Sequence, residues 1–146
     1  MLRKFTLVLL LGVIPSILFI GCMATKPYAE IKPSGNEAIV YIYRPESPIY
    51  RGTPYFVYIN GKKLGTIINA AYLPARVKPG NNTVSLKENT LFEAPVDQKN
   101  YIFEKNKAYY IRVNSGLFGA FTLEKVPNSI GSKEILDTKF YEDSIK

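Results

Sequence analysis

From Ala38 onward the chain consists of short apolar runs separated by glycine, proline and asparagine. The first run, AIVYIYR at 38–44, is β-branched or aromatic at almost every position, as is typical of a strand buried on both faces. TVSLKE at 83–88 instead alternates between apolar and polar side chains, the pattern of a strand with one face in water. This part of the chain is therefore predicted to form strands rather than helices.

Six further segments have strand character. They are TPYFVYIN (53–60), KLGTII (63–68), AYLPARV (71–77), VDQKNYIFEK (96–105), AYYIRVN (108–114) and FGAFTLEKV (118–126). Asn60-Gly61 fits a type I′ hairpin, in which both central residues need a positive φ, and Pro79-Gly80 fits a type II turn. About eight strands at this spacing predict an all-β fold, an antiparallel β-sandwich over residues 38–127.

The tail at 128–146 fits two structures. Ile135, Leu136 and Phe140 would share one face of a short helix capped by Ser132, or residues 134–136 would add an edge strand. The sequence favours the short helix.

The N-terminus has the three parts of a secretory signal. Two positive charges, Arg3 and Lys4, precede an uncharged run of 17 residues, FTLVLLLGVIPSILFIG at 5–21. The run is shorter than the ~20 residues that span a bilayer, and Pro15 interrupts it. Residues 1–21 are therefore expected to direct export and to be removed.

Leu18-Phe19-Ile20-Gly21-Cys22 resembles the lipobox of bacterial lipoproteins. The resemblance implies cleavage between Gly21 and Cys22 and a diacylglyceryl thioether on Cys22, the single cysteine of the chain. Met23, where an aspartate would resemble a retention signal, implies the outer membrane of the cell envelope. The alternative is an uncleaved anchor with an unmodified Cys22. Residues 22–37, which hold two prolines and a Ser-Gly pair, are expected to be a flexible tether reaching about 20 Å.

The order of IVYIYRP, VYINGKKLGTI, AYLPARVKPGNNTVSL, KAYYIRV and FTLEKV resembles a family of short bacterial lipoproteins known only as a domain of unknown function. The middle of the chain also resembles PEGA-type surface modules, which are small β-sandwiches. These resemblances imply a fold and a membrane address, and they bring no activity or catalytic residues.

Composition excludes several enzyme classes. The chain has no histidine and one cysteine, so a Ser-His-Asp triad or a Cys-His pair cannot form, and zinc, haem and iron–sulfur groups lose their usual ligands. We expect no cofactor or metal and a non-enzymatic protein. Without residues 1–21 the chain keeps 17 basic and 12 acidic residues, a net charge of +5. Nucleic acid would suit this charge, but export argues against it.

Six basic residues fall around the first predicted hairpins: Arg44, Arg51, Lys62, Lys63, Arg76 and Lys78. They would form a cationic face for anionic lipid headgroups, lipopolysaccharide phosphates or cell-wall carboxylates. Alternatively they are solvated strand ends, where lysine protects exposed sheet edges.

The connection ESPIYRGTPY at 46–55 offers Tyr50, Arg51 and Tyr55 as a recognition surface for sugars or peptides. The alternative is that both tyrosines cover the core with their hydroxyls in water.

Glu88, Glu93 and Asp97 are the acidic residues of the strand region that lie closest together. They are candidates for a glycosidase carboxylate pair or, as we favour, serve solubility alone.

Three functions follow from the sequence. The first is a lipid-anchored envelope protein that binds or assembles; the others are a module that binds or cleaves cell-wall glycan, and a subunit that pairs a sheet edge with another envelope protein.

Overall fold

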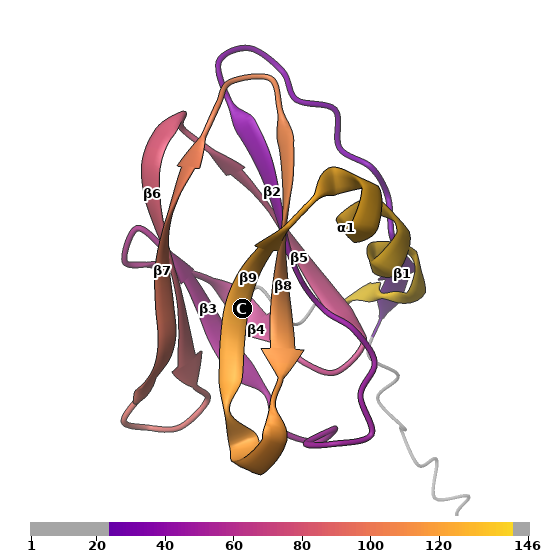
Figure 1. Ribbon diagram of the computed structural model, residues 1–146, viewed down its shortest axis with the longest axis vertical. Helices are drawn as coiled ribbons and strands as arrows, with labels where there is room; N and C mark the ends of the chain where they lie inside the picture. Colours follow the sequence, from indigo (N-terminus) through magenta and orange to yellow (C-terminus); the bar gives the residue numbers. More distant parts are fainter. Residues whose placement is uncertain (1–23, 142–146) are drawn as a thin grey trace, which may run out of the picture.

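The computed structural model describes residues 24–141, so the predicted signal peptide and Cys22 lie outside the described residues. Two β-sheets face each other (Figure 1), which confirms the all-β sandwich. The first sheet contains, in spatial order, β1 (Thr25–Pro27), β10 (Lys139–Tyr141), β5 (Ala71–Val77), β2 (Ala38–Arg44), β8 (Ala108–Ser115) and β9 (Phe121–Val126). The second contains β4 (Lys62–Ile67), β3 (Tyr55–Ile59), β6 (Gly80–Glu88) and β7 (Pro95–Phe103).

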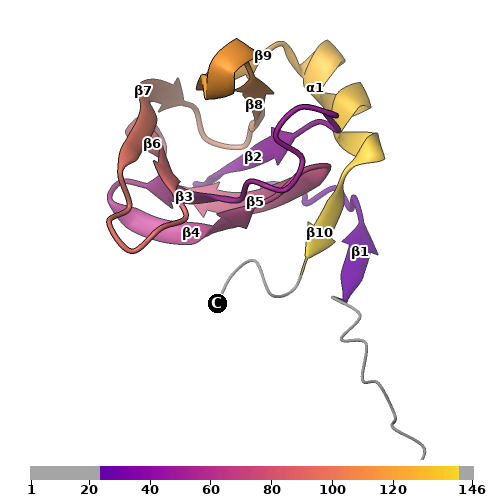
Figure 2. The ribbon, with the colours of Figure 1, turned by 90° about the horizontal axis from the view of Figure 1, so that it is seen from below.

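All eight predicted strands are present, and β2 and β5 have the predicted bounds. Most neighbours are antiparallel, but β2 pairs with β8, and β10 with β5, in parallel. The hairpin prediction at Asn60-Gly61 is confirmed, since both residues have positive φ, 50° and 78°. Viewed from below, the second sheet lies on one side of the molecule and β2, β8 and β9 on the other (Figure 2).

The main core lies between the two sheets, and β2 shows why its sequence is apolar throughout. Val40 and Ile42 point into this core. Ile39, Tyr41 and Tyr43 belong to a second buried cluster on the outer face of the first sheet. The strand is therefore buried on both faces, as predicted.

The segment at 24–37 corrects the expectation of a flexible tether. β1 pairs with β10, placing Thr25 opposite Tyr141. The Tyr28 ring packs edge-on against Tyr41 at 5.4 Å between centroids, and the Ile31 N–H donates to the Tyr41 hydroxyl over 2.6 Å. Tyr28 and Ile31 thus cover the outer face of β2, and the chain is part of the folded body from Thr25 onward.

The tail contains both a helix and a short strand, at positions other than those expected, and the strand lies between β1 and β5 rather than at an edge. Helix α1 (Asn128–Glu134) begins after Pro127, so Ser132 lies inside it rather than at its cap. The chain continues through a 3-10 turn (Ile135–Asp137), in which Ile135 is buried, into β10. The expected helical face of residues 135, 136 and 140 is wrong because the helix ends before it.

Four tyrosines pack against one another in the outer cluster of the first sheet: Tyr28, Tyr41, Tyr72 and Tyr110. Tyr41 and Tyr110 stack at 5.3 Å between ring centroids, and the hydroxyls of Tyr28 and Tyr110 lie 3.4 Å apart. Burial raises the pKa of Tyr28, Tyr72 and Tyr110 above the ordinary value of 10.0. The fold therefore holds these phenols in the neutral form.

This arrangement predicts a loss of stability at alkaline pH. Because the folded-state pKa is raised, the contribution is complete below pH 10 and is lost as the pH rises above it. A titration that records tyrosinate absorbance and circular dichroism together should show these phenols ionising only as the fold is lost. Complete tyrosine ionisation near pH 10 with an unchanged native spectrum would contradict the packing described here.

Candidate functional site

A groove opens where β4 and β5 separate. The two strands follow one another in the chain but belong to different sheets. β4 is an edge strand, and β10 pairs with β5 only through Lys139 and Ala71, so the later part of β5 is left without a strand on that side. The space between them is about 770 Å³. We call it the basic groove; its lining residues are Ile59, Asn60, Lys62, Lys63, Leu64, Pro74, Ala75, Arg76, Val77 and Lys78.

The groove combines apolar walls with a cationic rim. Ile59, Ala75 and Val77 are buried residues that also belong to the main core. The four basic side chains, Lys62, Lys63, Arg76 and Lys78, are exposed, and no acidic residue lines the groove. A concave surface with charges of one sign concentrates ions of the opposite sign, so the groove is suited to an anion.

The rim is held by a buried amide that the sequence analysis did not single out. Asn82 is 3 % exposed, and its Nδ2 donates to the carbonyls of Lys78 and Gly80 over 3.0 and 2.9 Å. Its Oδ1 accepts from Asn60 Nδ2 over 2.8 Å. Asn82 therefore ties the β3–β4 turn to the β5–β6 turn and fixes Lys62 and Lys78 on either side of the groove.

Two of the rim cations have further contacts. Lys63 Nζ lies 3.3 Å from the centroid of the Phe56 ring. Arg76 Nη1 lies 3.1 Å from Ser34 Oγ and 3.4 Å from Glu37 Oε2. The Arg76–Glu37 pair is exposed, and such pairs contribute little, so Arg76 stays available to another anion.

Arg44 is a correction to the predicted cationic face, because its side chain is fully buried. Its Nη1 and Nη2 donate to the carbonyls of Thr53 and Tyr50, each over 2.6 Å. Its guanidinium carbon lies 4.8 Å from the centroid of the Phe121 ring. Burial lowers the pKa of Arg44. The residue organises the connection between β2 and β3 and cannot meet a ligand from solvent.

The proposed recognition surface at 46–55 is only partly exposed. Tyr55 is buried against Phe121, with 4.4 Å between ring centroids, so the expectation that it contacts a ligand is also corrected. Tyr50 keeps 39 % of its surface, and the exposed Arg51 pairs with Glu46 over 2.8 Å. This connection enters β3 at Tyr55, whereas the groove begins at the other end of that strand. The structure therefore separates Tyr50 and Arg51 from the groove lysines.

The three acidic candidates have different surroundings. Glu88 is exposed, and Glu93 accepts a hydrogen bond from the Tyr58 hydroxyl. Asp97 Oδ2 accepts a hydrogen bond from the backbone N–H of Leu123 over 2.7 Å. The carboxylate thus satisfies a backbone donor of the edge strand β9. These contacts favour structural roles. Within residues 24–141 no group of three or more acidic, cysteine or histidine side chains is placed to hold a metal ion.

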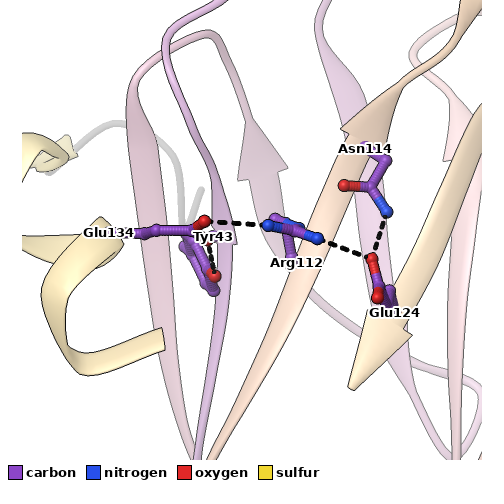
Figure 3. Close-up of polar contacts among 5 residues, drawn as sticks. All are labelled: Tyr43, Arg112, Asn114, Glu124 and Glu134. Carbon is purple, nitrogen blue, oxygen red and sulfur yellow. Dashed lines mark hydrogen bonds and ion pairs between the residues drawn. The ribbon is translucent and has the colours of Figure 1, made fainter. Parts of the chain in front are cut away.

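A second polar group, also not anticipated from the sequence, lies on the outer face of the first sheet (Figure 3). Arg112 of β8 donates to Glu134 of α1 and to Glu124 of β9, each over 2.8 Å. The Tyr43 hydroxyl donates to Glu134 over 2.5 Å, and Asn114 Nδ2 donates to Glu124 over 2.8 Å. The hydrogen bond from Arg112 lowers the pKa of Glu124. Both carboxylates are thus engaged, and the network fastens α1 to the sheet.

The comparisons with known proteins identify a family. A family model described as "Protein of unknown function (DUF2846)" matches residues 34–120, a range that includes β2 to β8 and the whole basic groove. No curated protein matches the chain. Within the described residues, no helix has the length and apolar character needed to cross a membrane.

Proposed function

The chain belongs to the DUF2846 family of proteins of unknown function, and we propose that it is a non-enzymatic, lipid-anchored protein of the bacterial cell envelope that binds an anionic amphiphile in its basic groove. The anchor is proposed from the signal-like residues 1–21 and from Cys22. By the same resemblance the membrane is the outer membrane. The observation that carries the binding function is the groove itself.

The chemistry of the groove indicates what it would bind. Four cations at the rim, Lys62, Lys63, Arg76 and Lys78, suit a phosphate or a carboxylate. The apolar walls beneath them would cover a hydrocarbon chain, which gains about 25 cal/mol for each Å² removed from water. A ligand with both parts is an acylated anion, whose sources in an envelope are phospholipids and the lipid part of lipopolysaccharide.

The glycan-binding alternative has less support from the structure. It relied on two tyrosine rings, and only Tyr50 remains exposed, because Tyr55 is in the core. The carboxylates proposed for glycan cleavage are exposed or engaged by neighbouring strands. These observations favour the groove over the 46–55 connection as the binding surface.

Charge reversal in the groove should weaken binding strongly. A cation near an anionic lipid surface contributes about 1 kcal/mol, so the loss of two cations alone should weaken binding roughly 30-fold, and the two new carboxylates should weaken it further. The variant is Lys62→Glu with Lys78→Glu, and the measurement is calorimetric titration with short-chain phosphatidylglycerol and, separately, with lipid A.

The matched control carries Lys105→Glu and Lys133→Glu, which make the same change in net charge at exposed positions outside the groove. It should bind like the unaltered protein, and short-chain phosphatidylcholine should bind weakly to all three. Equal weakening in both variants would show that net charge, and not the groove, governs binding. Preference for one anionic ligand would identify the source of the amphiphile.

A further inference from the structure

One end of the sandwich exposes large apolar side chains on two connections. They are Leu91 and Phe92 between β6 and β7, which are 93 % and 87 % exposed, and Leu117 and Phe118 between β8 and β9, which are 72 % and 98 % exposed. Ile49, in the connection between β2 and β3, is also exposed. We call these five side chains the apolar tips.

The three connections are all at the lower end of the molecule in Figure 1, and the view from below in Figure 2 shows the β6–β7 and β8–β9 connections on opposite sides of that end. The Tyr50 ring, in the β2–β3 connection, reaches the β8–β9 connection, since a Cβ on Gly119 would lie 3.5 Å from the Tyr50 hydroxyl. A small pocket lies between residues 53–55, at the end of the β2–β3 connection, and residues 88–90, at the start of the β6–β7 connection. The tips therefore form one apolar end rather than separate exposed residues.

The backbone of these connections is strained in a way that burial does not explain. Each connection contains a residue other than glycine in the left-handed region: Tyr50 at φ 53°, Glu93 at φ 45° and Phe118 at φ 59°. This conformation is unfavourable for bulky side chains, and Phe118 gains no compensating burial. Strain of this kind is concentrated at functional surfaces.

The start of the body indicates what covers this end. Because β1 is paired, the folded body begins at Thr25, three residues after Cys22, and three residues span at most about 10 Å. If Cys22 carries the lipid, as in the proposed function, the body must lie against the bilayer. In Figure 1 β1 lies at one flank, in the lower half of the body, the half that ends in the apolar tips.

We propose that the apolar tips insert into the lipid bilayer and form a second membrane contact beside the acylated N-terminus. Aromatic and aliphatic side chains that enter the bilayer move from water into hydrocarbon, which is favourable. Charges of both signs flank the tips, with Arg51 beside Glu46 and Lys87 beside Glu93. Insertion is therefore driven by apolar contact and does not require anionic lipid.

The test uses the absence of tryptophan from the chain. The full lipidated protein is reconstituted in phosphatidylcholine vesicles as the variants Phe118→Trp, Phe92→Trp and Lys105→Trp, the last placing the probe on the exposed β7–β8 turn. The two tip variants should show blue-shifted emission and quenching by lipids brominated on their acyl chains. The Lys105→Trp variant should keep the emission of a probe in water and be quenched by iodide.

Flotation of the same vesicles separates this inference from the proposed anchor. Protein that floats with the vesicles while the Phe118→Trp and Phe92→Trp probes remain in water would overturn membrane insertion and leave the tips for a protein partner. Protein that does not float at all would overturn the anchor. Blue-shifted, lipid-quenched emission from all three variants would also overturn the inference, because the contact would not be specific to the tips.

Discussion

Replacing Cys22 with serine is expected to abolish the incorporation of labelled fatty acid completely. Serine has no thiol to form the thioether, and the chain contains no second cysteine that could replace it. Each buried methylene of an acyl chain contributes about 0.8 kcal/mol, so membrane partition should fall by orders of magnitude. Labelling is measured with residues 1–21 in place, because acylation is expected to need the lipobox-like residues 18–21. Membrane partition is measured on a second version with a conventional cleavable signal in place of residues 1–21, so that an uncleaved apolar segment does not itself retain the protein.

Two controls make this result specific. Met23→Ala alters the neighbouring residue and keeps the thiol, and it should be labelled and fractionate like the unaltered protein. The signal replacement with Cys22 retained should be neither labelled nor membrane-bound, because it lacks the lipobox-like residues 18–21, and it shows whether the thiol alone attaches the protein. Undiminished labelling of the Cys22→Ser protein would contradict the acylation proposal.

Replacing Gly131 with alanine is expected to give the largest loss of stability among single-methyl changes in the tail. A Cβ at Gly131 would lie 2.3 Å from Tyr110 Cβ and 2.4 Å from Tyr110 Cγ. Tyr110 belongs to the central part of the first sheet, so its Cβ cannot move without the strand. Overpacking of this kind typically costs 1–3 kcal/mol, and we expect about 2 kcal/mol after the gain in helix propensity. The loss is measured as a change in the free energy of unfolding, from chemical denaturation monitored by circular dichroism.

Ser132→Ala is the matched control, because Ser132 is the next residue of the same helix and is exposed. It should be neutral or slightly stabilising, since alanine favours helix. If Gly131→Ala were as stable as this control, α1 could not lie against Tyr110 as described. The Gly131→Ala variant should also loosen the contacts of Arg112 with Glu134, which depend on the position of the helix.

The strands could be predicted because their signals are local. The apolar run at 38–44 and the turn at Asn60-Gly61 each act over a few residues, and both agree with the structure. Part of the groove's lining could be predicted for the same reason. Lys62 and Lys63 were candidates by their place beside a turn, but their position opposite Arg76 and Lys78 depends on how the two sheets separate.

The corrections concern residues whose surroundings come from distant parts of the chain. Arg44 ends a strand, where a cation is normally solvated, and it is buried because Phe121 and the carbonyls of a long connection enclose it. The segment expected to be a tether is polar in composition, and it is attached by the pairing of β1 with β10 and by two apolar side chains, Tyr28 and Ile31. The role of Asn82 could not be predicted, because asparagine is common near turns and only the structure shows that its amide is buried.

The proposed attachment close to the membrane would give the groove and the apolar tips a common setting. A body that begins three residues after an acylated Cys22 cannot move far from the lipid surface. An amphiphile from that surface would then reach the groove over a short distance, and the tips would limit the orientations that the body can take. The supply of ligand to the groove and the contact of the tips with lipid would therefore both be favoured by the modification of one sulfur atom.

Mass spectrometry of the native protein tests that modification most directly. The account predicts an N-terminal peptide that begins at Cys22 and carries the mass of a diacylglyceryl group on the sulfur. A peptide that begins at Met1, with an unmodified Cys22 thiol, would contradict it.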